Sequence, residues 1–408
     1  MNNMYLEINS FIGTPDGWIR AKNVHKERNF ILGPSVDNDQ AYNGVIEEVP
    51  GYRVSLSNGQ IFKCTDNLHV LIMDNLTGGY LKPISECKED ELLGVIKEHI
   101  FAQDYKKFIL KGRRSRYNDG SIVFDEGLAY LMGLYLGDGC LTGRSWKRAT
   151  FIFVTNKDNT DFIINVIQPL LRFGNRTKRG KKVRVQETKN YDLLFLNNAV
   201  FGNWVEQWFG TNKDKRVPDF IFESPRSVVE NFLAGLMDAD GGYSKTGSAT
   251  FWNSNIEIVR EVANVLAFLG IEARFSKRKQ KYKYKDGREG FLYALHFYSI
   301  YNLPLRVNKK KARQLLRKEG KSGRWYIDRE CVDKKYRKWS GGNHALYYYL
   351  KGQCKYVREH VLSDLGTDHY KYFPVKILKI EKIEKIKALI LSSDSQWCIG
   401  DGRIYNGL

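Results

Sequence analysis

The sequence predicts an α+β fold in which a β-rich domain is split around two similar subdomains of helices and strands. Three observations lead to this expectation: short strand-like runs at both ends of the chain, a helical motif that occurs twice in the middle, and a similar order of stretches after each copy. A chain of 408 residues is also too long for one ordinary core. We therefore expect several domains.

The N-terminal segment, residues 1–113, alternates short apolar runs with turn residues. Thr14-Pro15-Asp16-Gly17 precedes WIRAKNV, and Ser57-Asn58-Gly59 separates YRVSL from IFKCT. Asn-Gly is a strong hairpin signal because type I′ turns need positive φ at both central residues. Residues 373–408 again have the pattern of strands. Both ends of the chain are thus predicted to be rich in β-structure.

An internal repeat organises the middle of the chain. LMGLYLGDG (131–139) and LAGLMDADG (233–241) match at Leu, Gly, Leu, Asp and Gly, and the first helix is expected to begin near Glu126. Strand-like, basic sequence and then a helix-like stretch follow each copy. The duplication predicts two subdomains, residues 114–220 and 221–320, related by a pseudo-twofold axis. Residues 321–372 form a basic and aromatic insert, which is either a DNA contact or a small packing domain.

Small residues within each motif predict how the two helices meet. Gly133 and Gly137 lie four residues apart in the first motif, as do Gly235 and Ala239 in the second. Residues four apart share one face of a helix, and small side chains there let two backbones approach closely. We expect the two motif helices to pack against each other along these faces.

An Asp-Gly pair ends each motif. Gly139 and Gly241 are able to adopt a left-handed cap, which would leave Asp138 and Asp240 side by side at the ends of the paired helices. A carboxylate at a helix C-terminus opposes the macrodipole, and two carboxylates repel each other. A divalent cation between them removes both penalties, and carboxylate oxygens suit Mg²⁺, with Mn²⁺ as a substitute. Metal-activated hydrolysis of a phosphodiester follows from this arrangement.

The overall charge indicates a polyanionic partner. The formal charge is +19 and the pI is about 9.4, and clustered Lys and Arg bind a phosphate backbone by releasing its counterions. The sequence has neither a long apolar run nor a signal-like start, which argues against a membrane partner. Its six cysteines contain no Cys-x-x-Cys pair, as expected for an intracellular protein in a reducing compartment.

Two basic strand-like ribbons occupy equivalent places in the two repeats. KRGKKVRVQ alternates charged or polar side chains with valines, and RFSKRKQKYKYKDGREGF places lysines on one strand face, with Asp286-Gly287 as the turn. A two-stranded ribbon fits the major groove, where such side chains contact phosphates and base edges. The predicted DNA contacts are Lys182, Arg184, Gln186, Lys279, Lys281, Tyr282, Lys283 and Lys285.

The repeated motif resembles that of a known enzyme family. FLAGLMDADGGY and YLMGLYLGDGC are similar to the two motifs of LAGLIDADG homing endonucleases, and the resemblance covers about residues 115–320. It implies two αββαββα subdomains in which the last Asp of each motif, Asp138 and Asp240, binds the catalytic metal. Asp238 matches a non-catalytic position of the family motif, and its counterpart in the first copy is Leu136.

The same resemblance implies lysines in the site. Lys215-Arg216-Val217-Pro218 resembles a Lys-x-apolar-Pro segment of intein-associated members, whose lysine lies in the active site, so Lys215 is a third catalytic candidate. A solvated lysine beside a turn is the alternative. In the second half Tyr301 stands where the lysine would be, and either Lys309 or Lys310 could take the role.

The two ends of the chain resemble the Hint domain of inteins. SFIGTPDGW, NGQIFKCTDNLHVLI and GYLKPISECKEDELL are similar to its first blocks, and FPVKILKIEKI and QWCIGDGRIYN to its last two. Splicing groups are missing, however. Tyr5 stands at the nucleophile, Leu68 at a block histidine and Tyr405 at the penultimate histidine; Asn406 is retained, but Gly407 has no hydroxyl or thiol. The chain is thus predicted not to splice.

These observations favour a monomeric, Mg²⁺-dependent enzyme that cuts both strands of a long, asymmetric site in double-stranded DNA. The family resemblance implies short 3′ overhangs. Two alternatives stay open: a DNA-binding relic with an inactive nuclease site, and an intein that still splices. The presence of both Asp138 and Asp240 argues against the first, and the missing nucleophiles argue against the second.

Overall fold

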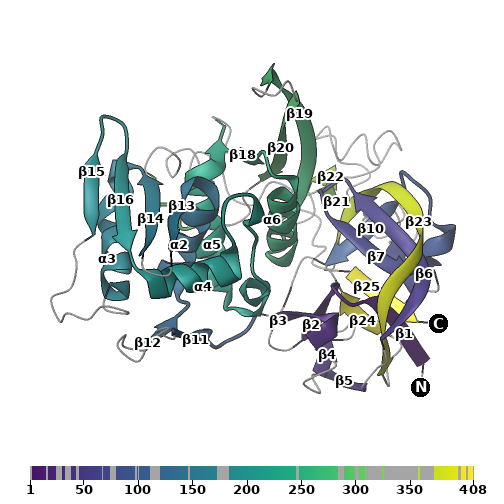
Figure 1. Cartoon of the computed structure of the whole chain (residues 1–408). Coiled ribbons are helices and arrows are strands. Elements are labelled where there is room, and N and C mark those ends of the chain that lie inside the picture. The colour runs from purple at the N-terminus through teal and green to yellow at the C-terminus, as the bar shows by residue number, and fades with distance from the viewer. Residues whose placement is uncertain are drawn as a thin grey trace, which may run out of the picture. The chain divides into compact units, whose positions relative to one another are not determined.

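The structure, a computed structural model, forms two compact units: residues 1–101, 266–275 and 318–408, and residues 102–265 and 276–317. The residues that it describes are 2–14, 17–23, 30–32, 38–42, 46–66, 68–73, 80–96, 99, 101–110, 120–145, 148–171, 183–244, 248–283, 289–298, 303–307, 310, 324–325, 357–358, 372–393, 397–400 and 403–407. Helix and strand labels follow Figure 1. Among these residues no helix is long and apolar enough to cross a membrane.

The first unit is built on one large sheet that draws strands from both ends of the chain (Figure 1). The order along the sheet is β1-β7-β6-β23-β10-β8-β25-β24-β2-β3, with β5 also paired to β23, β4 to β5, and β9 to β8. The bounds are Asn2–Glu7 (β1), Phe11–Thr14 (β2), Gly17–Arg20 (β3), Phe30–Leu32 (β4), Asn38–Tyr42 (β5), Ile46–Leu56 (β6), Ile61–Thr65 (β7), Leu68–Ile72 (β8), Tyr80–Pro83 (β9), Leu92–Ile96 (β10), Tyr372–Ser393 (β23), Trp397–Gly400 (β24) and Arg403–Gly407 (β25).

Strand β23 links the two ends of the chain within this unit. It runs antiparallel to β1, β6 and β10, while β25 pairs with β8. Alternate residues of β8 and of the second half of β6 (Tyr52, Val54 and Leu56) are buried, as expected for strands with one face on a core. Two short strands, β21 (Arg324–Trp325) and β22 (Val357–Arg358), pair with each other in the region of the basic insert. The sequence predicted strands at both chain ends, and they share one sheet.

The second unit contains the repeated helices, each followed by a four-stranded sheet. Helix α2 (Glu126–Asp138) precedes a sheet of order β13-β14-β16-β15, and α5 (Arg226–Asp240) precedes one of order β17-β18-β20-β19. Their strands are Cys140–Ser145 (β13), Arg148–Thr155 (β14), Arg184–Glu187 (β15), Asp192–Asn197 (β16), Gly241–Tyr243 (β17), Ser248–Asn253 (β18), Ala273–Lys283 (β19) and Glu289–Tyr298 (β20).

Three further α-helices, three short 3-10 helices (Lys157–Asn159, Asn212–Asp214 and Asp219–Glu223) and a hairpin also belong to this part of the chain. The α-helices and the hairpin are α3 (Thr160–Leu170), α4 (Ala199–Phe209), α6 (Ile256–Phe268), and the pair β11 (Lys107–Leu110) and β12 (Gly120–Val123). Asp125 starts α2 by accepting a hydrogen bond from the Leu128 amide at 2.9 Å, and Asn198 starts α4 in the same way. Gly210, with φ of 69°, ends α4. The predicted helix start near Glu126 is confirmed.

The two motif helices pack backbone to backbone. A Cβ atom at Gly133 would lie 2.2 Å from the Phe232 carbonyl oxygen, and one at Gly235 would lie 2.1 Å from the Tyr130 carbonyl oxygen. A Cβ at Gly137 would lie 2.4 Å from Cβ of Ala239. No larger side chain fits at such separations, so the predicted helix packing through small residues is confirmed (Figure 1).

The predicted left-handed caps at Gly139 and Gly241 are wrong. Gly139 has φ of −80° and Gly241 has φ of −99°, both in the extended region, because each helix runs directly into a strand. Glycine is required there for space instead. A Cβ at Gly139 would lie 2.5 Å from Tyr135 Cα, and one at Gly241 would lie 2.6 Å from the Met237 carbonyl oxygen.

The helix contact makes a direct prediction about stability. Gly235→Ala places a methyl group against the Tyr130 carbonyl, and we expect it to lower the free energy of unfolding by about 1–3 kcal/mol, measured by urea denaturation. Gly127→Ala, in the first turn of α2, is the matched control, because the nearest atom to a Cβ there is a movable Val166 methyl carbon at 3.1 Å and no backbone atom is close. Equal stability of the two variants would contradict the close packing.

Candidate active site

The last residues of the two motif helices are Asp138 and Asp240. The close contact of α2 and α5 brings them together: the Asp240 carboxyl carbon would lie 3.4 Å from a Cβ atom at Gly137. Burial, followed by the charge of Asp138, raises the pKa of Asp240 to about 6. Asp138 is the more exposed of the two, yet neighbouring protein atoms remove enough water to raise its pKa as well. The structure therefore places the two predicted carboxylates close enough for the charge of Asp138 to affect the pKa of Asp240.

Lys215 closes the C-terminal end of α2. Its Nζ donates hydrogen bonds to the carbonyl oxygens of Tyr135 at 2.7 Å, Leu136 at 3.1 Å and Gly139 at 2.8 Å. An ammonium at this end of a helix satisfies carbonyls that lack intrahelical partners and opposes the negative end of the macrodipole. Burial lowers the pKa of Lys215 to about 8, against the opposing pull of Asp240. Lys215 is thus no freely solvated lysine.

Lys310 closes the end of α5 in the corresponding way. Its Nζ donates to the carbonyl oxygens of Met237 and Asp238, both at 2.7 Å, and lies 3.4 Å from that of Ala239. Burial lowers its pKa, and the charge of Asp238 opposes that shift. Of the two lysines left open by the sequence, Lys310 therefore lies at the carboxylates. Lys309 lies outside the described residues.

Asn253 is a site residue that the sequence interpretation missed. It is the last residue of β18, and its Nδ2 donates a 2.9 Å hydrogen bond to Oδ2 of Asp240. In the second sheet, Phe251 lies opposite Gly241, and Asn253 follows two residues later. In the first sheet, the Cys140–Ile152 pair places Phe153 opposite Gly139, so the residue that corresponds to Asn253 is Thr155. Thr155 donates instead to the carbonyl of its neighbour, Asn156. A polar residue at the end of the strand opposite the motif was the available signal.

The open face of the first sheet carries two of the predicted DNA contacts. Arg184 pairs with Phe195 and Gln186 with Leu193, whereas the intervening Leu194 is buried. The guanidinium carbon of Arg184 lies 5.1 Å from the Phe195 ring centroid. Arg184 and Gln186 are exposed and share this face. Lys182 lies outside the described residues.

The second sheet assigns its faces differently from the sequence interpretation. His296 contacts Thr250 at 3.1 Å and Ser276 at 2.8 Å, which places Ser276, and by alternation Arg278 and Gln280, on the open face. Lys279 is exposed but points to the other face. Lys277 shares that face, with its Nζ 3.9 Å from the Phe291 ring centroid.

Four further predicted DNA contacts follow Lys279 in the same ribbon. Lys281, Tyr282 and Lys283 belong to β19, but their side chains are outside the described residues, as is Lys285.

The predicted splicing positions all fall in the large sheet of the first unit. Tyr5 pairs with Ile390, Tyr405 with Val70 and Asn406 with His69, while Leu68 is buried and pairs with Gly407. The side chains of Tyr5, Tyr405 and Asn406 are outside the described residues. A strand that contains Asn406 therefore runs beside the strand that begins with Leu68.

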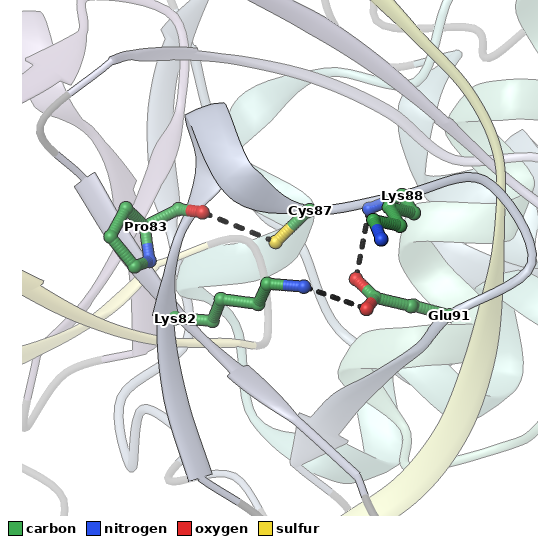
Figure 2. A network of polar contacts seen from close by, with 5 residues as sticks. All are labelled: Lys82, Pro83, Cys87, Lys88 and Glu91. Atoms are coloured by element: carbon green, nitrogen blue, oxygen red, sulfur yellow. Dashed lines mark hydrogen bonds and ion pairs between the residues drawn. The ribbon is translucent and has the colours of Figure 1, made fainter.

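Cys87 is a half-buried cysteine that directly follows the short helical turn Ile84–Glu86. Its Sγ donates to the Pro83 carbonyl at 3.4 Å, and Lys82 and Glu91 form a 2.7 Å ion pair beside it (Figure 2). Burial, reinforced by the charge of Glu91, raises the pKa of the Cys87 thiol to about 12. A thiol that stays protonated at neutral pH is not an activated nucleophile.

Comparison with known proteins gives an independent finding for part of the chain. Residues 216–310 match the family described as homing endonuclease. Similar curated proteins include the DNA polymerase of Thermococcus sp. (strain GE8), 28% identical over 246 residues, which are 59% of this chain and 14% of that protein. The ribonucleoside-diphosphate reductase NrdEB subunit alpha of Bacillus subtilis (strain 168) is 26% identical over 185 residues, 41% of this chain and 17% of that protein. The chain thus spans under a fifth of the length of either relative.

Two similar solved structures are complexes with DNA. A variant of I-DmoI with its nicked target DNA and manganese has 18% identity and a TM-score of 0.31, covering 42% of this chain and 88% of that chain. I-WcaI bound to its DNA recognition sequence has 17% identity and a TM-score of 0.32, covering 46% of this chain and 85% of that chain.

Proposed function

We propose that the chain is a site-specific endonuclease that cuts both strands of a long, asymmetric site in double-stranded DNA. The observation that carries this proposal is the meeting of α2 and α5 at Asp138 and Asp240, with a lysine on each helix end. The homing endonuclease match over residues 216–310 supports it. Because one chain supplies both carboxylates, we infer that the protein acts as a monomer. We further propose that its substrate is intracellular DNA.

Mg²⁺, with Mn²⁺ as a substitute, fits Asp138 and Asp240. The mutual charge of the two carboxylates contributes to the raised pKa of Asp240, and Mg²⁺ is commonly held by one or two carboxylates together with substrate phosphates and water. No group of three or more His, Cys, Asp or Glu in the described part of the chain could hold a metal. When bound, the ion activates water and offsets negative charge on the phosphate.

The protein side chains then have separate tasks. Hydrolysis forms a bond between a water oxygen and phosphorus and breaks the bond to the leaving sugar oxygen. The attacking water releases a proton to the solvent, and the leaving oxygen takes one up. Lys215 and Lys310 are the cationic groups beside the carboxylates, and we assign them charge stabilisation and proton donation. Asn253 fixes the orientation of Asp240 through its amide hydrogen bond.

DNA is proposed to lie on the open faces of the two four-stranded sheets. Arg184 and Gln186 project from one, and Arg278 projects from the other. The corresponding strand orders of the sheets support a pseudo-twofold pair of αββαββα subdomains, so that each half faces half of the target. Arginine and glutamine contact phosphates and base edges in the major groove.

The strands at both ends of the chain are proposed to form a Hint-like domain that no longer splices. The pairing of β23 with β1 and of β25 with β8 supports a domain made of both ends. The matches to a polymerase and a reductase, each over a small part of that protein, support an origin as an element carried within unrelated hosts. Tyr5, Leu68, Tyr405 and Gly407 are unsuited to acyl transfer.

Replacement of both carboxylates tests the nuclease. With Mg²⁺, the purified wild-type protein is expected to cut one site in a plasmid library of the DNA that flanks its own coding sequence. The Asp138→Asn, Asp240→Asn double variant should lose at least about 1,000-fold in cleavage rate, because it loses the metal ligands, while mobility shift shows retained binding. Tight binding without cleavage by the wild-type protein would instead favour the inactive DNA-binding relic.

The salt dependence of binding tests the assignment of the DNA-binding faces. Arg184→Ala and Arg278→Ala should each reduce the slope of log K against log salt concentration by about one, as expected for a lost phosphate contact. Lys279→Ala, on the opposite face of β19, should leave the slope unchanged. A change with Lys279→Ala alone would place the DNA on the other face.

Fusion of foreign sequences to both ends of the chain tests the loss of splicing. We expect mass spectrometry to find only the intact fusion after prolonged incubation, since the acyl-shift nucleophile and the penultimate histidine are replaced by Tyr5 and Tyr405. Ligated flanking sequences would establish a splicing-competent intein.

A further inference from the structure

The segment that carries Lys310 is held by a buried carboxylate. Oδ2 of Asp238 accepts hydrogen bonds from the backbone amides of Arg306 at 2.7 Å and Val307 at 3.4 Å. The Lys310 amide in turn donates to the Val307 carbonyl at 2.9 Å. Asp238 therefore connects α5 to the segment that delivers Lys310 to the end of the same helix.

Residues of the first repeat complete this attachment. Tyr130 of α2 donates its hydroxyl hydrogen to Asp238 at 2.6 Å, and Asn159 donates to the Tyr130 oxygen at 2.5 Å. The guanidinium carbon of Arg306 lies 3.3 Å from the ring centroid of Phe162, on α3. The Lys310 segment thus rests on helices of the opposite repeat.

A second carboxylate holds the segment that carries Lys215. Oε2 of Glu261 accepts a 2.6 Å hydrogen bond from the Val217 amide, two residues after the lysine. Glu261 belongs to α6, which follows the second motif. Before the lysine, the Tyr135 hydroxyl donates to the Gly210 carbonyl at 2.8 Å. The Lys215 segment is therefore also attached to the opposite repeat, through a carboxylate that accepts from its backbone.

We propose that Glu261 and Asp238 are positioning residues, the first for Lys215 and the second for Lys310, and that they couple the two halves of the site. The hydrogen bonds of Glu261 and Asp238 do not depend on the proposed nuclease function, but the effect on cleavage that we infer from them rests on it. Charge-assisted bonds from backbone amides to carboxylates are strong and directional. Packing of the helix pair does not itself demand an acid at this position, because Leu136 stands at the place of Asp238 in α2.

Competitive lysine acylation of the full-length protein, read by peptide mass spectrometry, tests the positioning without any need for cleavage. A lysine that donates to several carbonyls is protected from the reagent. Glu261→Leu should raise the acylation rate of Lys215 about tenfold, the equivalent of one lost charged hydrogen bond, and leave Lys310 unchanged. Asp238→Leu should do the reverse. Glu261→Gln and Asp238→Asn keep an acceptor oxygen and should restore most of the protection. These two variants keep the test decisive if the leucine variants do not fold.

Leu196→Ala, a core truncation in β16, controls for general destabilisation and should expose neither lysine selectively. Exposure of both lysines in every variant, or of neither, would overturn the inference. Strand-resolved cleavage is the second readout: the two leucine variants should accumulate nicked plasmid with opposite strand preference and unchanged KM. Selective acylation with no cleavage by the wild-type protein would refute the nuclease but leave the positioning intact, whereas normal cleavage with unselective acylation would refute the positioning alone.

Discussion

The contact between α2 and α5 is the constraint on which the rest of the second unit depends. At Gly133 and Gly235 each helix meets the backbone of the other, so the separation of the axes is fixed by main-chain atoms and not by side chains that could repack. The helices end together, and each runs without a turn into the first strand of a sheet. The positions of the two carboxylates and the starting points of both sheets thus follow from a single interface.

That geometry creates an electrostatic problem, which two lysines partly solve. Each helix brings the negative end of its dipole and an aspartate to the same place, and burial raises the pKa of both carboxyl groups. Lys215 and Lys310 return positive charge to the carbonyls beneath them, and their own pKa values fall because they too are partly buried. The result is a compact group of four ionisable side chains at the ends of the two helices.

Much of this site could be predicted from the sequence because the signal was periodic and duplicated. Small residues four apart predicted the helix contact, and the repeated Asp-Gly placed Asp138 and Asp240. Asn253 was missed because its role depends on which strand end lies opposite Asp240, a tertiary contact that local pattern does not contain. The cap geometry was wrong for a related reason: Asp-Gly commonly ends a helix in a left-handed turn, but here Gly139 and Gly241 serve close packing in extended chain. Lys279 and Gln280 lie on opposite faces of β19, as predicted, but the open face could be identified only through His296 and its partners.

The glycine contact also has an evolutionary consequence. Substitutions at the helix interface displace backbone, so this part of the protein has little freedom to change. The side chains on the open sheet faces, such as Arg184 in one half and Arg278 in the other, project away from the buried face of their sheet and can be exchanged without disturbing the carboxylates. Under the proposed function, chemistry and recognition would therefore be separable, because the open-face side chains could change to suit a new DNA sequence while Asp138 and Asp240 keep their positions.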